Sequence, residues 1–217
     1  MKSAFYVNLG PISLGKISKL LSADINGMDP EKKFDEFVGI DKIKNIDNTL
    51  SFIYENYIEK IDISKKLNLI ISKKEKNKFS GFNNLIFVNN VHEAVAKLSS
   101  IFYRDINDDD IKENNPNKIG DDCIISNSAI IKKGVIIGKN SIIKDGVIIN
   151  NNCILGENSL IEENVVISNS IIGDNVRIGR NTSIGQPGFG FAINSHSNYK
   201  IYHLGRVILQ SNASIGS

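Results

Sequence analysis

The sequence contains no tryptophan and has only two cysteines and four prolines among its 217 residues. Two cysteines cannot form the disulfide framework of a small secreted protein, and these two are not spaced as a redox Cys-X-X-Cys pair. No apolar run approaches the roughly 20 residues of a membrane-spanning helix, and residues 1–22 contain no secretory apolar segment. These absences predict a cytoplasmic protein without stable membrane insertion.

An excess of charge of one sign is also lacking. The chain has 26 Lys and Arg residues against 24 Asp and Glu residues, which gives a formal net charge of +2. This balance does not indicate a nucleic-acid partner or an anionic membrane. A hydrophobic content of 41% is enough for the core of one or two globular domains.

An aliphatic residue recurs at every sixth position from Ile119 onward. The period slips by one residue after Ile167 and is interrupted after Ile184. Neither an α-helix nor the two-residue alternation of a strand produces a period of six. The repeat predicts a parallel β-helix, in which short strands stack coil upon coil. The members of the series are Ile119, Ile125, Ile131, Ile137, Ile143, Ile149, Leu155, Ile161, Ile167, Ile172, Ile178, Ile184, Leu209 and Ile215.

The residues around each aliphatic position support the same interpretation. Small or β-branched residues stand two positions earlier, on the face of the strand that points inward. Asn or Gly mostly stands three positions later, where a sharp corner needs a left-handed backbone. A series of antiparallel hairpins is the alternative, but hairpins have no reason to keep one phase over so many repeats. The predicted corner residues are Gly134, Asn140, Gly146, Asn152, Asn158, Asn164, Asn175, Asn181 and Asn212.

The chain divides into segments of different character. Residues 1–105 mix strand-like apolar runs with two amphipathic helical segments, which predicts a small α/β domain. Residues 106–118, with an acidic run and Asn-Asn-Pro-Asn, are predicted to be a linker. The β-helix is expected over 119–217. A loop insertion at 186–206 leaves the repeat and is therefore expected to serve function rather than stacking.

The side chains that could carry chemistry are few. His92 is interpreted as a solvated residue at the start of a helix, His196 as an exposed loop residue and His203 as a positioning or structural residue. The histidines and cysteines do not have metal-ligand spacing, so no metal site is predicted. Cys123 and Cys153 fall at inward positions and are expected to pack there. No phosphate loop or serine nucleophile motif is present, and no cofactor is implied.

Three stretches resemble the UDP-3-O-acylglucosamine N-acyltransferases of lipid A biosynthesis. The first is Leu-Ser-Phe-Ile-Tyr-Glu-Asn-Tyr at 50–57, and the second is Leu-Ile-Phe-Val-Asn-Asn at 85–90, leading into a helix at 91–102. The third and most specific is Gly-Phe-Gly-Phe at 188–191 followed by Tyr-Lys-Ile-Tyr-His-Leu-Gly-Arg-Val at 199–207. The resemblance runs through essentially the whole chain in the order of the family.

This resemblance implies a left-handed parallel β-helix assembled as a homotrimer. It also implies transfer of a 3-hydroxyacyl chain from acyl carrier protein to the 2-amine of UDP-3-O-acylglucosamine. The family holds the uracil between two aromatic rings in a Phe-x-x-Asn-x-x-Tyr pattern. Phe52 matches the first ring, Tyr57 falls one residue early, and Asn56 is displaced from the Asn position, which Glu55 occupies. Phe52, Asn56 and Tyr57 are therefore the predicted substrate-binding residues, with Phe52 as a plain core residue the alternative.

The sequence departs from the family in two further places. Pro187 stands where the family has Asp before Gly-Phe-Gly-Phe. The family's general base is a His several repeats beyond the loop, and no residue up to Ser217 aligns with it. An amine that attacks a thioester needs a base to accept its proton. The chain is thus expected to be an N-terminal portion of a longer enzyme, with no catalytic residue of its own and no catalysis.

Two other functions fit the pattern. One is a sugar-nucleotide acetyltransferase that uses acetyl-CoA, with a similar prism and a different acyl donor. The other is a non-catalytic β-helix that binds a nucleotide sugar or serves as an assembly scaffold.

Overall fold

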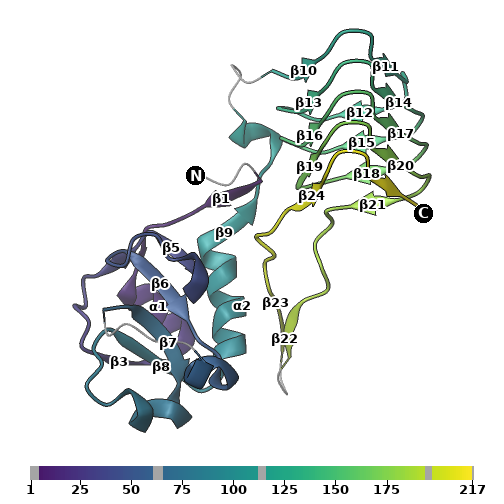
Figure 1. Ribbon diagram of the computed structural model, residues 1–217. Helices are drawn as coiled ribbons and strands as arrows, with labels where there is room; N and C mark the ends of the chain where they lie inside the picture. The colour runs from purple at the N-terminus through teal and green to yellow at the C-terminus, as the bar shows by residue number, and fades with distance from the viewer. Residues whose placement is uncertain (1–4, 61–65, 112–115, 194–196, 217) are drawn as a thin grey trace. The chain divides into compact units, whose positions relative to one another are not determined.

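Most strands of this chain are only two or three residues long, and most of those after residue 117 stack into a parallel β-helix (Figure 1). The computed structural model describes residues 5–60, 66–111, 116–193 and 197–216. The predicted fold class, a mainly β protein with a parallel β-helix after a small α/β domain, is confirmed. The chain forms two compact units: Met1–Val7, Asp105–Gly188 and His203–Ser217 make up one, and Asn8–Arg104 with Phe189–Tyr202 the other.

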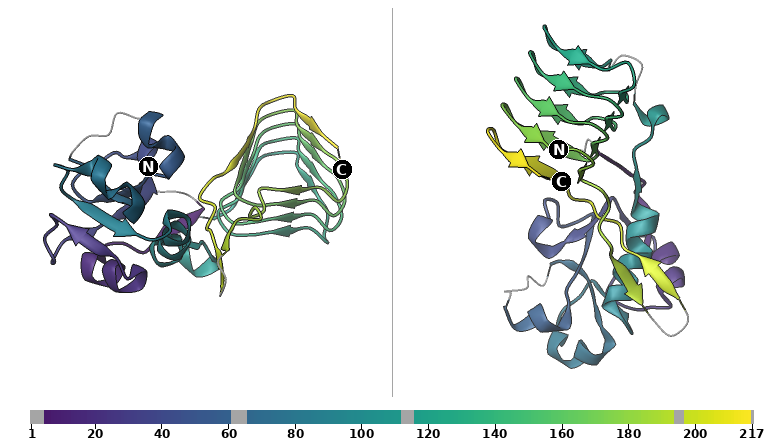
Figure 2. Two further views of the ribbon diagram at one scale, coloured as in Figure 1. Left: turned by 90° about the horizontal axis from the view of Figure 1, so that it is seen from below. Right: turned by 90° about the vertical axis from the view of Figure 1, so that its right-hand side faces the viewer.

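The β-helix has three parallel sheets, called here its first, second and third walls. Lys118 pairs with Ile136 and Ile136 pairs with Ile154, so one coil contains eighteen residues, or three hexapeptides. Seen from below, the coils superpose (Figure 2). The first wall contains β10 (Lys118–Ile119), β13 (Ile136–Ile137), β16 (Ile154–Leu155), β19 (Ser170–Ile172) and β24 (Val207–Leu209). The second contains β11 (Ile124–Ile125), β14 (Ile142–Ile143), β17 (Leu160–Ile161), β20 (Arg177–Ile178) and β25 (Ser214–Ile215). The third contains β12 (Ile130–Ile131), β15 (Ile148–Ile149), β18 (Val166–Ile167) and β21 (Ser183–Ile184).

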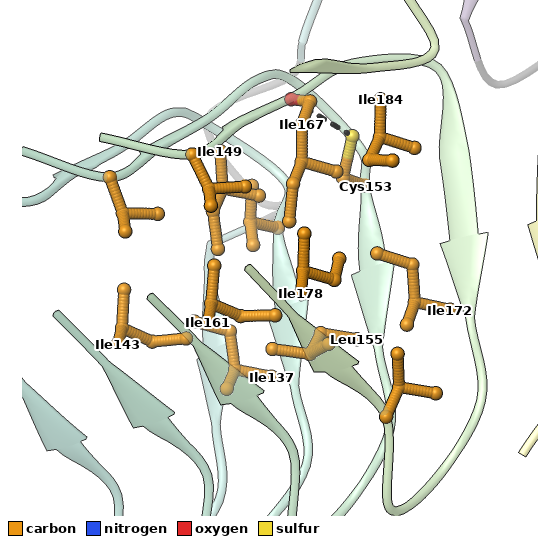
Figure 3. Close-up of a cluster of buried hydrophobic side chains, with 14 of the residues drawn as sticks. Ile137, Ile143, Ile149, Cys153, Leu155, Ile161, Ile167, Ile172, Ile178 and Ile184 are labelled. Carbon is orange, nitrogen blue, oxygen red and sulfur yellow. Dashed lines mark hydrogen bonds between the residues drawn. The ribbon is translucent and has the colours of Figure 1, made fainter. Parts of the chain in front are cut away.

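The aliphatic residues of the six-residue series from Ile125 onward form the interior of the prism (Figure 3). Ile119, in the first coil, was predicted to point inward but is 50% exposed and does not join this cluster. The small residues two positions earlier join them: Val135, Ser141 and Val147 are fully buried. Since each strand is flat and short, every coil adds one layer of side chains to a continuous apolar column. All of the corner residues predicted to be left-handed have positive φ: Gly134, Asn140, Gly146, Asn152, Asn158, Asn164, Asn175, Asn181 and Asn212.

The slip in the period shortens one corner. Asn169 takes a left-handed conformation (φ 46°) between β18 and β19, and Ile154 pairs with Ile171, seventeen residues on. The later interruption does not end the stack, because β24 pairs with β19 and β25 pairs with β20. The coil therefore continues where the chain returns from the insertion.

Part of the segment predicted as a linker folds against the coils. Asn107 caps η4 (Asp108–Asp110) by accepting hydrogen bonds from the N–H groups of Asp109 and Asp110. Asp108 accepts a hydrogen bond from Asn151 Nδ2 at 2.8 Å, and Lys133 Nζ donates to its carbonyl at 3.3 Å. The acidic run thus has basic and amide partners on the coil surface.

The small domain contains a five-stranded sheet with the order β3-β8-β7-β6-β5. Its strands are β3 (Asp24–Asn26), β5 (Glu36–Gly39), β6 (Thr49–Phe52), β7 (Asn68–Ser72) and β8 (Leu85–Val88). Strands β5 to β8 run parallel, and β3 pairs antiparallel with β8 at the edge. Strands β7 and β8 are buried along their whole length, because apolar clusters cover both faces of the sheet.

Two α-helices cover one face of this sheet. The first, α1 (Leu14–Leu21), is capped by Ser13, and the second, α2 (Val91–Phe102), is capped by Asn90. Their buried residues join those of β5, β6, β7 and β8 in one cluster. No helix among the described residues is long and apolar enough to cross a membrane.

Short elements complete the chain. Strand β2 (Ile12–Ser13) pairs with β4 (Lys33–Phe34), and β1 (Tyr6–Asn8) pairs with β9 (Tyr103–Asp105). The 3-10 helices η1 (Ile40–Lys42), η2 (Glu55–Lys60) and η3 (Lys73–Phe79) follow β5, β6 and β7. The insertion forms an antiparallel hairpin of β22 (Phe191–Ile193) and β23 (Asn198–Lys200), which packs on α2.

Candidate functional site

The carboxyl ends of the parallel strands meet at one edge of the small-domain sheet. Elements η1, η2, η3 and α2 begin there, directly after β5, β6, β7 and β8. Ligands of α/β sheets bind at such an edge, because the segments that follow the strands converge on it. The predicted residues Phe52, Asn56 and Tyr57 all lie at this edge, at the end of β6 or on η2.

Phe52 is half-buried at the end of β6. Its ring centroid lies 5.4 Å from that of Phe37 and 5.3 Å from that of Tyr54. Phe37 in turn lies 5.8 Å from Phe102 of α2. Phe52 therefore belongs to the rim of the core and also borders the edge, so the geometry is compatible with both interpretations of this residue. Its contact with a nucleobase stays a prediction.

Tyr54 and His92 extend this series of rings to the surface. Their centroids lie 5.9 Å apart, with Tyr54 half-buried and His92 exposed at the second position of α2. Burial raises the pKa of the Tyr54 hydroxyl, which therefore stays protonated and can donate a hydrogen bond at neutral pH. The series Phe102, Phe37, Phe52, Tyr54 and His92 thus leads from the core to the carboxyl edge.

Sequence reasoning missed the pairing of Tyr54 with His92. His92 was interpreted as a solvated helix-start residue, and it is exposed, but its ring also contacts Tyr54. One signal was present: Tyr54 stands two residues after Phe52, so both point to the same side of the extended chain. The approach of His92 depends on the path of α2 over the sheet, which local sequence does not specify.

Asn56 and Tyr57 lie on η2 and are exposed, with 47% of Tyr57 accessible to solvent. The N–H of Tyr57 donates to the carbonyl of Tyr54 at 3.0 Å, so a tight turn follows directly after the aromatic series. This turn keeps Asn56 and Tyr57 close in sequence and space to Tyr54. Their contacts with a ligand stay predictions.

The N-terminus of α2 contributes a positive electrostatic potential to the same edge. Asn90 Oδ1 accepts a hydrogen bond from the N–H of Glu93 at 3.2 Å, and the N–H of Ala94 donates to the carbonyl of Asn90. A helix N-terminus favours anions, because the first N–H groups point out of the helix. The edge therefore combines aromatic rings with an environment that suits a phosphorylated ligand.

The hairpin attaches to α2 through polar and aromatic contacts. Lys97 forms an ion pair with Glu93 at 2.6 Å, and its Nζ lies 4.7 Å from the ring centroid of Tyr199. The N–H of Tyr202 donates to Ser99 Oγ at 3.2 Å. Ile201 packs against the cluster that contains α2. These contacts hold the insertion on the helix that begins at the carboxyl edge.

His203 lies where the insertion returns to the coils. A Cβ added to Gly188 would stand 3.0 Å from Cε1 of His203, so the imidazole lies directly over the glycine backbone. Tyr6 Oη donates to the carbonyl of Gly205 at 3.0 Å beside it. His203 is exposed. Its imidazole fits in this position because Gly188 has no side chain.

Both cysteines line the interior of the coils, as predicted. Burial raises the pKa of the Cys153 thiol to about 11, so the thiol is protonated at neutral pH and is a poor nucleophile. Cys123 is half-buried, and its Sγ lies 3.2 Å from the carbonyl of Gly138.

Comparison with known proteins finds similarity mainly over the β-helix. Residues 114–216 match the family model described as the GMPPB C-terminal domain. No curated protein sequence matches the chain significantly. One similar solved structure is the D94A mutant of AntD, an N-acyltransferase from Bacillus cereus in complex with dTDP and coenzyme A. It is 23% identical, with a TM-score of 0.38, and the match covers 46% of this chain and 60% of that protein.

Proposed function

We propose that the small domain binds the nucleotide part of a nucleotide sugar and that the β-helix belongs to an acyltransferase acting on that sugar. The reaction is transfer of a 3-hydroxyacyl chain from acyl carrier protein to the 2-amine of UDP-3-O-acylglucosamine. The observation that carries the proposal is the aromatic series that ends with Tyr54 and His92 at the carboxyl edge. The three sequence stretches that resemble the acyltransferases also support it, since the first lies at this edge and the third forms the hairpin.

The edge offers the two features that a nucleotide needs. A flat, weakly polar base stacks well on aromatic rings, because dispersion and the ring quadrupole both contribute. The diphosphate gains from the positive end of α2, which starts beside His92. In this arrangement the base packs by Phe52, Tyr54 and Tyr57, and the phosphates lie toward Asn90.

The chemical step has a simple balance. The amine nitrogen attacks the thioester carbonyl, the carbon–sulfur bond breaks, and the thiol of the carrier leaves. A base must accept the proton of the amine. No residue among the 217 of this sequence aligns with the base of the acyltransferases that the sequence resembles. If transfer is measured, His203 is the first base to test, by His203→Ala.

Calorimetric titration with UDP tests the nucleotide site. We expect Phe52→Ala and Tyr54→Ala each to weaken binding by about tenfold, because each removes an aromatic contact of roughly 1.5 kcal/mol. Phe82→Ala is the matched control: Phe82 is also half-buried in this domain, but it belongs to the cluster on the other face of the sheet. Equal affinity of all three variants and the unchanged protein would contradict the assignment.

The acyl donor separates the proposal from its two alternatives. Acylated carrier protein as the donor supports it, and acetyl-CoA as the donor supports an acetyltransferase. Binding of UDP without transfer of either group would indicate a non-catalytic scaffold.

We also propose that the protein forms a homotrimer through the walls of the β-helix. Many outward positions on the three walls are isoleucine or leucine, including Ile130 and Ile148 on the third, where a solvated sheet would have polar residues. Ile124, Ile142 and Leu160 lie outward on the second wall, and Ile136, Ile154, Ile171 and Ile208 lie outward on the first. Light scattering after size exclusion should give about 72 kDa, three times the 24.0 kDa of one chain. A mass near that of one chain at micromolar concentration would contradict trimerisation.

A further inference from the structure

The hairpin of β22 and β23 presents apolar side chains to solvent. Phe189 is 94% exposed and Ile193 is 71% exposed. The ring of Phe191 lies 4.9 Å from that of Phe189. The other face of the hairpin is the attached one, because Ala192 is buried and Tyr199 contacts Lys97 of α2. The apolar side chains therefore alternate with the residues that face α2.

The second strand adds a cation to the same face. Lys200 pairs in register with Phe191, so their side chains project to the same side of the hairpin. Lys200 Nζ lies 5.8 Å from the ring centroid of Tyr202. We call Phe189, Phe191, Ile193, Lys200 and Tyr202 the outer face of the hairpin.

The balanced charge of the whole chain conceals an uneven distribution along it. Asp174 is the last acidic residue, and residues 175–217 contain four cations and no Asp or Glu. Arg177 and Arg180 form ion pairs with Glu162 and Glu163. The other two cations, Lys200 and Arg206, lie in the insertion. Exposed aromatic and aliphatic side chains beside basic ones, without carboxylates, are typical of surfaces that contact lipid headgroups.

The exposure of Phe189 indicates what kind of partner covers this face. A ring that lined a groove for a single acyl chain would be partly covered by the opposite wall of that groove. The ring of Phe189 has almost no contact with the rest of the chain. Such a ring is better suited to insertion into a lipid bilayer than to binding one enclosed acyl chain. We propose that the outer face of the hairpin is a peripheral contact site for an anionic phospholipid bilayer. The contact is reversible, since only three apolar side chains, one tyrosine and one cation form it.

Sedimentation with vesicles tests this proposal, using the unmodified protein, since the nucleotide site is not involved. The vesicles contain phosphatidylcholine with either none or about a third phosphatidylglycerol. We expect the protein to sediment with the anionic vesicles and to be released by salt, because screening weakens the attraction. The double variant Phe189→Ser, Ile193→Ser should bind at least tenfold more weakly, since burial of one large apolar side chain corresponds to about that factor. Lys200→Gln should bind about fivefold more weakly.

Ile25→Ser is the matched control, since Ile25 is exposed on β3 of the same unit and lies on a different element from the hairpin. It should bind as the unmodified protein does. The double hairpin variant should keep the unmodified melting temperature, because the two side chains that it removes are 94% and 71% exposed. Absence of sedimentation with anionic vesicles at low salt would overturn the proposal. So would equal binding by the double variant, or a loss of oligomer mass in that variant by light scattering, which would assign the outer face to contacts between copies of the chain.

Discussion

Glycines that follow the inward aliphatic residues mark the places where successive coils approach most closely. A Cβ on Gly138 would stand 2.5 Å from the backbone nitrogen of Glu157 in the next coil. Strand separation is set by the backbone hydrogen bonds between coils, so it cannot widen to admit a methyl group. The recurrence of Gly at this position is therefore explained by the spacing of the coils.

Gly138→Ala should lower the free energy of unfolding by about 1–3 kcal/mol, the usual cost of overpacking. Gly205→Ala is the matched control, because a Cβ there has no atom within 4 Å. Urea denaturation followed by circular dichroism measures both. Equal midpoints for the two variants would show that the coils relax around the added methyl.

The corner residues show how far single residues can be predicted. Asn152 and Asn164, for example, were expected to be left-handed from their place in the repeat, and their φ values are 58° and 59°. This prediction succeeded because the cost of a positive φ is a local property of the residue. Tyr54 and His92 are the opposite case, since neither residue has a local property that indicates the other.

At the scale of elements, helix α2 carries contacts to the sheet, the carboxyl edge and the hairpin. Asn90 caps it at the edge where the proposed nucleotide site lies. The sequence predicted its bounds correctly, because a capping residue is followed by apolar residues at helical spacing. Its role as the support of the hairpin was not predicted.

Asn90→Ala should destabilise the small domain by about 1 kcal/mol, since it removes the acceptor for the N–H of Glu93. Asn89→Ala, one residue earlier and outside the cap, should have little effect. Hydrogen exchange of the first turn of α2 provides the measurement, with faster exchange expected for Asn90→Ala alone. Unchanged exchange in that variant would show that the cap does not hold the helix end.

The insertion at 186–206 shows the limit of prediction for an element. The break in the repeat correctly marked a segment that leaves the coils. Its hairpin groups with the small domain rather than with the coils on either side of it in the sequence. Contacts such as that of Ser99 with Tyr202 join residues far apart in the chain, and no periodic pattern describes them.

At the scale of the whole molecule, charged side chains bind the coils to one another. Hydrogen bonds from Arg180 lower the pKa of Glu163 to about 2, and those from Arg177 lower the pKa of Glu162. A hydrogen bond from Asn151 likewise lowers the pKa of Asp108. A carboxylate with a lowered folded-state pKa stabilises the fold above its ordinary pKa, and the contribution is lost as the pH falls toward the folded value.

The denaturant concentration at the unfolding midpoint of the β-helix should therefore decrease as the pH is lowered from 4.5 to about 2. These two values are the ordinary and the folded-state pKa of Glu163. Glu163→Gln should be less stable at pH 7 and should show a shallower decline over this range. Denaturation at a fixed protein concentration measures this, because oligomerisation also shifts stability. An identical pH dependence in the variant would show that Glu163 does not contribute to the loss of stability at low pH.

The sequence by itself determined the β-helix, its inward side chains, its left-handed corners and the bounds of α2. These features depend on interactions between residues close in the chain or on a period repeated many times, so each one is signalled repeatedly. Only the tertiary structure decided that His92 meets Tyr54, that the hairpin packs on α2 and that Phe189 remains exposed. Those outcomes depend on single contacts between segments that are distant in the chain. Such contacts produce no repeated pattern in the sequence.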